Sequence, residues 1–304
     1  MWNKVFIFLL LSILSVYHLN AQDGIITFEV GSSTVTLLSE GQRTGGTNVL
    51  EGATEEMIKQ AIPEGAYPSA TNVFLIELAG KVMLIDAGLG KKTIENLELF
   101  GKKASDVDAI FITHLHGDHI GSLALDNVKS YPKATIYLSK PEYDYYMNDE
   151  TLNNLPENRR GGILNMRKLF DIYKNQLTVF TPGEIDNANA LIPGIKGVAA
   201  YGHTPGHAGY LLESDGSSLF FWGDLTHAMA IQMPFPEVAL VYDTDKTQAI
   251  ETRQKLLKYV ADNNIRIAGA HIQFPGMGDL KKNTSHGYKF TLTCSCEGQY
   301  PDTK

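Results

Sequence analysis

Cysteine is almost absent from this chain of 304 residues, and the two cysteines, Cys294 and Cys296, lie close to the C-terminus. Two cysteines separated by one residue close only a small, strained ring if they pair. No histidine or aspartate lies between them to complete a metal site. We interpret them as free or weakly paired thiols, so the hydrophobic core must stabilise the fold without help from disulfides.

Positive charge is also scarce, with 26 Lys and Arg against 34 Asp and Glu and a formal net charge of -8. An acidic chain binds polyanions poorly, which argues against nucleic acid as a partner. The chain has no Gly-x-Ser-x-Gly motif, and its cysteines are misplaced, so no protein nucleophile is evident. Internal repeats and shifts in composition are lacking as well, which predicts one domain.

The long apolar run lies at the N-terminus and is shorter than a transmembrane helix. It covers Val5–Leu14, follows Lys4, and precedes Leu19–Ala21, which ends on a small residue. A bilayer span needs about 20 apolar residues, whereas this pattern is typical of a secretory signal peptide. We predict that residues 1–21 are removed and that residues 22–304 form a single secreted or periplasmic domain without stable membrane insertion. An uncleaved anchor is the alternative.

Strand-like and helical patterns interleave along the rest of the chain, which predicts an α/β sandwich. Strands are expected at 24–30, 34–38, 71–78, 81–85, 107–113, 134–139, 177–180, 197–201, 209–213, 219–222, 265–270 and 287–293. Helices are expected at 54–62, 93–100, 141–147, 164–173 and 247–261. The polar residues 148–162, with Pro156 and a Gly-Gly pair, are expected to form an irregular loop near the active site or an insertion.

Four metal-capable side chains follow one predicted strand: His114, His116, Asp118 and His119. On a strand the first two would point to the same side. Gly117 would let the backbone turn and bring the other two back to the same point. Three imidazoles and a carboxylate suit zinc or a similar first-row metal.

Further His and Asp residues stand at the ends of other apolar strands, beside glycine or proline turns: Asp86, His203, Asp224 and His271. Strand ends on one edge of a sandwich can converge on one cleft, which the sequence alone does not show. We interpret Asp86 as a supporting or turn residue rather than a ligand. His207 either supports the site or is a core histidine bonded to a carbonyl, and we favour the structural interpretation.

These motifs together resemble those of the metallo-β-lactamase superfamily. The segment from His114 to His119 matches its HxHxDH motif, and the similarity runs from about Thr71 to His271. The resemblance implies an αββα sandwich that binds two metal ions, usually zinc. The implied ligands are His114, His116 and His203 for the first ion, Asp118, His119 and His271 for the second, and Asp224 as the bridge.

The resemblance also implies catalysis by a hydroxide that bridges the metals and attacks a carbonyl carbon or a phosphorus. Asp118 is expected to relay a proton to the leaving group. His227 stands where related lactonases present a tyrosine, so it is either an oxyanion donor or a wall of the cleft. The C-terminal third resembles the branch that contains methyl parathion hydrolase and secreted acyl-homoserine lactonases, in residues 223–227, 232–234, 242–245 and 270–278.

The substrate depends on the pocket, for which the sequence offers one set of apolar candidates: Met229, Ile231, Met233, Phe235, Phe274 and Met277. They are core residues or line a cleft that suits a hydrophobic ester or lactone. The leading hypothesis is a secreted di-zinc lactonase that opens N-acyl-homoserine lactones. An organophosphate triester hydrolase is the alternative. A β-lactamase is disfavoured by Asp224, and a non-catalytic metal protein by the complete ligand set. The oligomeric state stays open, a homodimer included.

Overall fold

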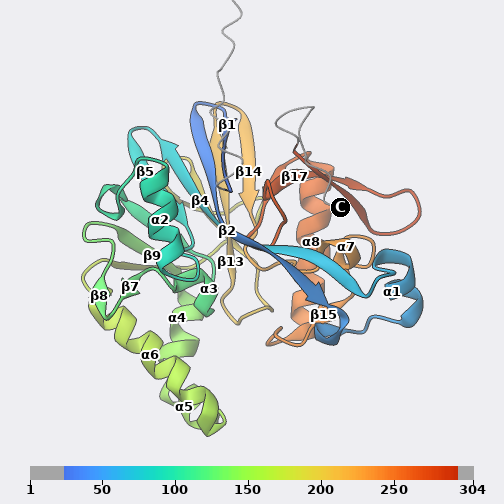
Figure 1. Cartoon of the computed structure of the whole chain (residues 1–304), viewed down its shortest axis with the longest axis horizontal. Helices are drawn as coiled ribbons and strands as arrows, with labels where there is room; N and C mark the ends of the chain where they lie inside the picture. Colours follow the sequence, from blue (N-terminus) through green and yellow to red (C-terminus); the bar gives the residue numbers. More distant parts are fainter. Residues whose placement is uncertain (1–23, 294–304) are drawn as a thin grey trace, which may run out of the picture.

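The computed structural model describes residues 24–293. Two seven-stranded sheets pack face to face and helices cover their outer faces, so the predicted αββα sandwich is confirmed (Figure 1). The predicted signal peptide and both cysteines lie outside the described residues. Within residues 24–293, no helix combines the length and apolarity needed to cross a membrane.

The first sheet has the strand order β1-β2-β4-β5-β6-β9-β10. Its strands are β1 (Ile25–Val30), β2 (Ser33–Gly46), β4 (Ala66–Leu78), β5 (Lys81–Ile85), β6 (Ala109–Ile112), β9 (Thr135–Ser139) and β10 (Leu177–Phe180). The second sheet has the order β11-β12-β13-β14-β16-β17-β18. Its strands are β11 (Ala190–Ile192), β12 (Ile195–Ala199), β13 (Ala208–Ser214), β14 (Ser217–Phe221), β16 (Arg266–Ala268), β17 (Met277–Lys282) and β18 (Tyr288–Leu292).

The helices are α1 (Glu55–Ala61), α2 (Lys91–Leu99), α3 (Gly117–Ile120), α4 (Lys140–Met147), α5 (Asp149–Asn154), α6 (Glu157–Tyr173), α7 (Met229–Gln232) and α8 (Lys246–Asp262). Two short ribbons pair β3 (Leu50–Glu51) with β15 (Ala239–Leu240) and β7 (Ala124–Leu125) with β8 (Val128–Lys129). Side-chain caps start α1 and α8, among others: Thr54 accepts from the Met57 amide and Asp245 from the Gln248 amide.

The strand pattern explains the layers, because successive side chains on a strand point to opposite faces. In β5, Met83 and Ile85 belong to the apolar cluster between the sheets, whereas Leu84 packs with helices α2, α4 and α6. In β6, Phe111 faces the second sheet. Helix α8 covers the far face of the second sheet through residues such as Leu257.

The prediction for residues 148–162 was wrong in one respect, because these residues are largely helical. Asn148 caps α5 by accepting from the Glu150 amide at 2.8 Å. Arg167 of α6 donates to the Asn148 carbonyl at 2.8 Å, which ties the end of α4 to α6. Long-range bonds of this kind outweigh the low helix propensity of the Gly-Gly pair. Helices α5 and α6 extend from the body of the molecule (Figure 1).

Strand direction places the candidate residues at one edge of the sandwich. Strands β5, β6 and β9 are parallel neighbours, and so are β14 and β16. Strand β12 runs in the direction of β14, because two antiparallel pairings through β13 separate them. The carboxyl ends of these strands therefore share an edge in each sheet, and the loops that follow them carry the predicted site residues.

Candidate metal centre

The loop after β6 carries the first four candidate residues. The Thr113 amide donates to Asp86 Oδ1 at 2.7 Å, which holds the start of the loop against the end of β5. His116 precedes the short helix α3, and Asp118 and His119 lie in that helix. Gly117 has a helical backbone, and nothing lies within 4 Å of the position its Cβ would take. The expected role of Gly117 was therefore wrong: the turn of α3, not glycine flexibility, separates the two halves of the motif.

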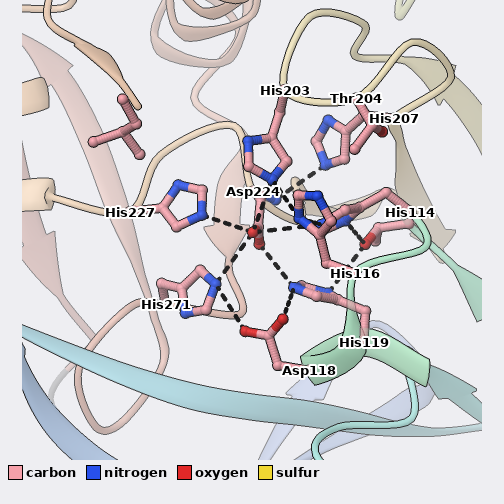
Figure 2. Close-up of polar contacts among 12 residues, drawn as sticks. His114, His116, Asp118, His119, His203, Thr204, His207, Asp224, His227 and His271 are labelled. Atoms are coloured by element: carbon pink, nitrogen blue, oxygen red, sulfur yellow. Dashed lines mark hydrogen bonds and ion pairs between the residues drawn. The ribbon is translucent and has the colours of Figure 1, made fainter. Parts of the chain in front are cut away.

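The first cluster brings together three imidazoles from two distant segments. His116 Nδ1 lies 3.0 Å from His114 Nε2 and 3.1 Å from His203 Nε2. Asp224 Oδ2 lies 3.6 Å from His114 Nε2 and 3.4 Å from His203 Nε2. These four residues offer ligand atoms that all lie within 4.8 Å of one another (Figure 2).

The second cluster lies on the other side of the same aspartate. His119 Nε2 lies 3.8 Å from Asp118 Oδ1, and His271 Nε2 lies 3.7 Å from Asp118 Oδ2. The Asp224 carboxylate reaches this cluster too, with Oδ1 3.2 Å from His119 Nε2 and Oδ2 3.2 Å from His271 Nε2. In Figure 2 Asp224 stands at the centre of the whole set. The structure thus brings all seven predicted ligand residues together in the predicted grouping.

In most of these rings a hydrogen bond at Nδ1, to a residue outside the ligand set, fixes the orientation of the ring. His119 donates to Asp86 at 2.7 Å and His203 donates to Asp243 at 2.9 Å. His271 Nδ1 contacts the Ala70 carbonyl at 2.8 Å. His114 Nδ1 lies 3.1 Å from the Thr113 hydroxyl, which itself donates to Asp86. Bonds of this kind fix the tautomer and direct the Nε2 lone pair of each ring towards the centre of the site.

His207 supports Asp224 through the backbone of that residue. Its Nδ1 donates to the Ala200 carbonyl at 2.7 Å, so its Nε2 is free to accept the Asp224 amide at 3.0 Å. Gly223, just before Asp224, has a φ of +54°, and a Cβ there would lie 2.5 Å from His207 Nε2. The structure gives His207 the structural role favoured from the sequence, and it explains the glycine before the aspartate.

His227 differs from the other rings of the site. Its Nε2 lies 2.7 Å from Asp224 Oδ2, and its ring stacks on His271 at 4.6 Å. Its Nδ1 is buried and has no hydrogen-bond partner among the described residues. Burial lowers the pKa of His227 to about 4, so the ring is neutral at physiological pH. A neutral ring that no partner orients at Nδ1 can adapt to a ligand in the cleft.

Charges in the site suit cation binding. Burial lowers the pKa of His116 to about 3 and holds that of His114 well below its usual value, so both are neutral with a free lone pair. Burial favours the protonated form of Asp224, but the surrounding histidines, His119 first, hold its pKa well below the usual value. An ionised, buried carboxylate thus lies beside the uncharged imidazoles of His114 and His116. Burial lowers the pKa of His119 and His271, but the charge of Asp224 outweighs it, so that the pKa of His271 is raised and that of His119 is raised well above its usual value.

The donor set fits two divalent ions rather than a self-contained hydrogen-bond network. His119 Nε2 and Asp224 Oδ1 are buried without a hydrogen-bond partner among the described residues, although they face each other. Buried polar atoms without partners are rare in folded proteins, and a cation between them would satisfy both. Imidazole and carboxylate ligands, most of them with supporting bonds behind, are typical of zinc and related first-row metals.

A cavity of about 970 Å³ opens on the His116 side of the site. Helices α4 and α6 supply most of its apolar wall, to which Val241 and Tyr242 also contribute. None of the apolar candidates named from the sequence lines this cavity: Ile231, Met233 and Met277 are buried core residues. The wall residues were missed because their spacing is that of ordinary amphipathic helices. The Tyr-rich segment 141–147 was the available signal.

Comparison with known proteins agrees with this geometry. The family model of the metallo-beta-lactamase superfamily matches residues 66–271, so the chain belongs to that superfamily. Among curated proteins, it is 31% identical over 121 residues to "Exodeoxyribonuclease WalJ" of Streptococcus pneumoniae, and the match spans 39% of each protein. The chain is also 29% identical over 197 residues to the uncharacterized protein YobT of Bacillus subtilis, covering 61% of this chain and 77% of YobT.

Solved structures share the fold over nearly the whole chain. The hydrolase AbOPH, described as a member of the beta lactamase superfamily, superposes with a TM-score of 0.82 at 27% identity and covers 90% of this chain and 99% of AbOPH. AidC, described as a dizinc quorum-quenching lactonase in complex with a homoserine product, gives a TM-score of 0.80 at 24% identity. It covers 90% of this chain and 99% of AidC.

Proposed function

We propose that this protein is a secreted or periplasmic di-zinc hydrolase that opens lactone rings, N-acyl-homoserine lactones among them. The observation that carries the proposal is that Asp224 lies within 3.6 Å of imidazole nitrogens from both ligand clusters, and that one ligand of the first cluster, His116, lines a cavity with a largely apolar wall. The description of AidC as a dizinc quorum-quenching lactonase supports the same class of activity.

His114, His116 and His203 would hold the first ion, Asp118, His119 and His271 the second, and Asp224 both. Two zinc ions, when bound, would lower the pKa of a water molecule and polarise the carbonyl of the substrate. The buried histidines behind Asp224 exclude bulk water from the base of the site, because His114, His119 and His207 are essentially inaccessible to solvent.

Asp118 is the carboxylate that can reach the leaving group. Its side chain is 27% exposed, against 2% for Asp224. Burial favours its protonated form, but His119 lowers the pKa of Asp118 below its usual value, so it is ionised and able to accept a proton. In the proposed reaction it takes the proton released by the attacking water and passes it to the ring oxygen that leaves.

His227 is the proposed hydrogen-bond donor to the carbonyl oxygen of the substrate. Its side chain is 13% exposed and lies beside Tyr242, with ring centroids 5.7 Å apart. Tyr242 lines the cavity, so His227 lies where the cavity meets the metal centre. A neutral imidazole has a single N–H, and His227 Nε2 faces Asp224 Oδ2 at 2.7 Å, so this N–H would be free for the substrate only when Asp224 is engaged by the metal ions. A donor aimed at a developing oxyanion typically contributes about 3 kcal/mol to catalysis.

The cavity favours a hydrophobic acyl group. Its wall includes Tyr145, Tyr146, Met166 and Leu169, and none of the described residues that line it is Lys or Arg. Apolar walls with few polar groups bind apolar substrates, whereas phosphate-rich substrates need cationic partners. Together with the net charge of -8, the lining argues against a nuclease activity like that named for WalJ.

An organophosphate triester is the second candidate substrate, because the same centre can direct attack on an uncharged phosphorus. Such a triester would fit the same uncharged, apolar wall. The two candidates differ in the shape of the electrophile and not in the residues that would bind the metals.

The test is a substrate panel with the mature chain, residues 22–304, loaded with zinc. The substrates are short-chain and long-chain acyl-homoserine lactones, a phosphotriester and a cephalosporin. We expect lactone hydrolysis that is faster with the longer acyl chains, and a zinc content of two per chain. Turnover of the cephalosporin without lactone hydrolysis would overturn the proposal.

Asp224→Ala is the matching loss-of-function variant. It removes the carboxylate shared by both clusters, so we expect activity on every substrate to fall by at least about 1000-fold, equivalent to about 4 kcal/mol. Asp144→Ala is the control, because Asp144 is 55% exposed and its one ion pair within residues 24–293 is with Lys140. If Asp224→Ala kept full activity and bound two ions, the shared-ligand arrangement would be wrong.

A further inference from the structure

Glu142 is a fully buried carboxylate that the proposed chemistry does not use. It lies in α4 with 0% of its surface exposed. Its Oε1 accepts from the Leu115 amide at 2.9 Å, and its Oε2 accepts from the Thr204 hydroxyl at 2.7 Å and the Gly206 amide at 2.9 Å. Burial raises the pKa of Glu142, whereas the hydrogen bonds from these three donors lower it. Burial of a carboxylate without a cationic partner costs several kcal/mol unless its lone pairs are satisfied.

The three donors belong to the two loops that carry the first ligand cluster. Leu115 lies between His114 and His116, and Thr204 directly follows His203. One carboxylate group therefore bonds to both loops, whose histidines are 3.1 Å apart at His116 Nδ1 and His203 Nε2. The loop after β6 also carries Asp118 and His119, but the bonds of Glu142 are to the residue between His114 and His116 and to residues that follow His203.

The second loop packs on the backbone of α4 without room for a side chain. A Cβ at Gly206 would lie 1.9 Å from the Glu142 amide nitrogen and 2.4 Å from its Cα. The loop after β12 can therefore approach α4 only with glycine at this position. This contact places the Gly206 amide within bonding distance of the carboxylate.

The same helix forms part of the cavity wall. Tyr145 and Tyr146, three and four residues after Glu142, line the cavity together with His116. Residues three and four apart lie on adjacent parts of a helix surface. Helix α4 thus contacts the ligand loops through Glu142 and forms part of the cavity wall through its two tyrosines.

We propose that Glu142 is a positioning residue that sets the separation of His116 and His203, and so determines the affinity and geometry of the first metal subsite. Through α4, it joins that subsite to the cavity wall. The proposal rests on the two-metal centre of the proposed function, but it does not depend on a lactone being the substrate.

The test uses chelator-stripped protein titrated with Co²⁺, followed by its visible spectrum. In Glu142→Gln the amide can donate but no longer accept at one of the two oxygen positions, so one or more of the three donors loses its partner. Because loss of a partner behind a metal ligand costs 10–100-fold in affinity, we expect a loss of about that size at the first subsite only. The cobalt spectrum of that subsite should change as well, which a purely structural role would not produce.

Variants of single ligands assign the two binding events. His203→Ala removes a ligand of the first subsite, and His271→Ala removes a ligand of the second. Thr204→Val is the milder companion to Glu142→Gln: it removes one of the three bonds while keeping the shape of the side chain, and it should weaken the first subsite in the same direction. It also keeps the test valid if Glu142→Gln does not fold.

Glu40→Gln is the matched control. Glu40 is also a carboxylate whose pKa is raised by burial, and it accepts from the Leu89 amide and the Thr93 hydroxyl. Neither donor belongs to a loop between ligands of the first cluster. Unchanged Co²⁺ affinity and spectrum in both Glu142→Gln and Thr204→Val would overturn the proposal. A wild-type protein that binds two ions but opens no lactone would instead overturn the substrate assignment and leave this test intact.

Discussion

Arg253 offers the sharpest test of how the site is supported from within the fold. This arginine of α8 is 1% exposed. It donates to three carbonyls, those of Leu225 at 2.8 Å, Pro236 at 2.9 Å and Val238 at 2.8 Å. Its Nη2 lies 3.6 Å from Asp243 Oδ2. Through these contacts it connects the loop that follows Asp224 to the carboxylate that orients His203.

Arg253→Met keeps most of the volume of the side chain but removes the charge and every donor. It leaves Asp243 buried with His203 and the Leu240 amide as its remaining partners. Removing one member of a buried ion pair costs about 3–5 kcal/mol, because the other charge stays in a dry environment. The three carbonyls that lose their donor also lower the stability of the fold, but this cost does not simply add to the cost of the broken ion pair. We expect the free energy of unfolding to fall by about 4 kcal/mol.

The assay is urea unfolding, supported by thermal denaturation. For a protein of this size, a loss of about 4 kcal/mol corresponds to a decrease in Tm of about 10 °C. Arg43→Met is the control, because Arg43 is exposed on β2 and its loss should change stability by less than about 0.5 kcal/mol. Arg253→Lys keeps the charge but cannot reach three carbonyls at once, so it should fall between the two. A loss below about 1 kcal/mol in Arg253→Met would refute the reasoning.

Three further substitutions test other parts of the structure. Gly223→Ala forces a Cβ to within 2.5 Å of His207 Nε2 at a φ of +54°; we expect reduced zinc content by elemental analysis, and normal loading would contradict it. Gly117→Ala adds a methyl group that meets no atom within 4 Å but faces the cavity; unfolding experiments should show a gain of up to about 1 kcal/mol, while kinetics should show a raised KM. Burial opposes ionisation of Asp108, but the Val82 amide lowers its pKa below the usual value of about 3.9. The ionised Asp108 carboxylate therefore stabilises the fold above its unfolded pKa, and this stabilisation is lost as pH falls through the lower folded pKa. The difference in unfolding free energy between wild type and Asp108→Asn should be constant above about pH 5 and shrink below about pH 4. A difference that grows on acidification would be inconsistent with this.

The structure also separates what local sequence decides from what packing decides. Alternating apolar residues specified most strands, and the helical spacing of apolar residues specified helices such as α8, because periodicity is a local property. The helical form of residues 148–162 was not predictable in this way. Bonds such as that from Arg167 to the Asn148 carbonyl form only after the chain has folded back.

The candidate ligands could be named from the sequence because their chemistry and spacing are unusual: a dense His/Asp motif followed by a histidine or an aspartate at each of three strand ends. Their supporting residues could not. Glu142, Asp243 and Arg253 occur in polar or amphipathic stretches, where charged side chains are normally exposed. Only the packed structure shows that they are buried behind the site.

The sequence by itself therefore determined the layers of the fold and the identity of the metal-capable residues. The period of the apolar residues and the chemistry of the possible ligands both follow from the order of the residues alone. The tertiary structure decided how these residues group around Asp224, which helices form the wall of the cavity, and which buried charges hold the loops. These features depend on contacts between segments far apart in the chain. Among them are the Glu142 carboxylate, which bonds residues 27 and 64 positions away, and the Nε2 atoms of His119 and His271, each 3.2 Å from Asp224.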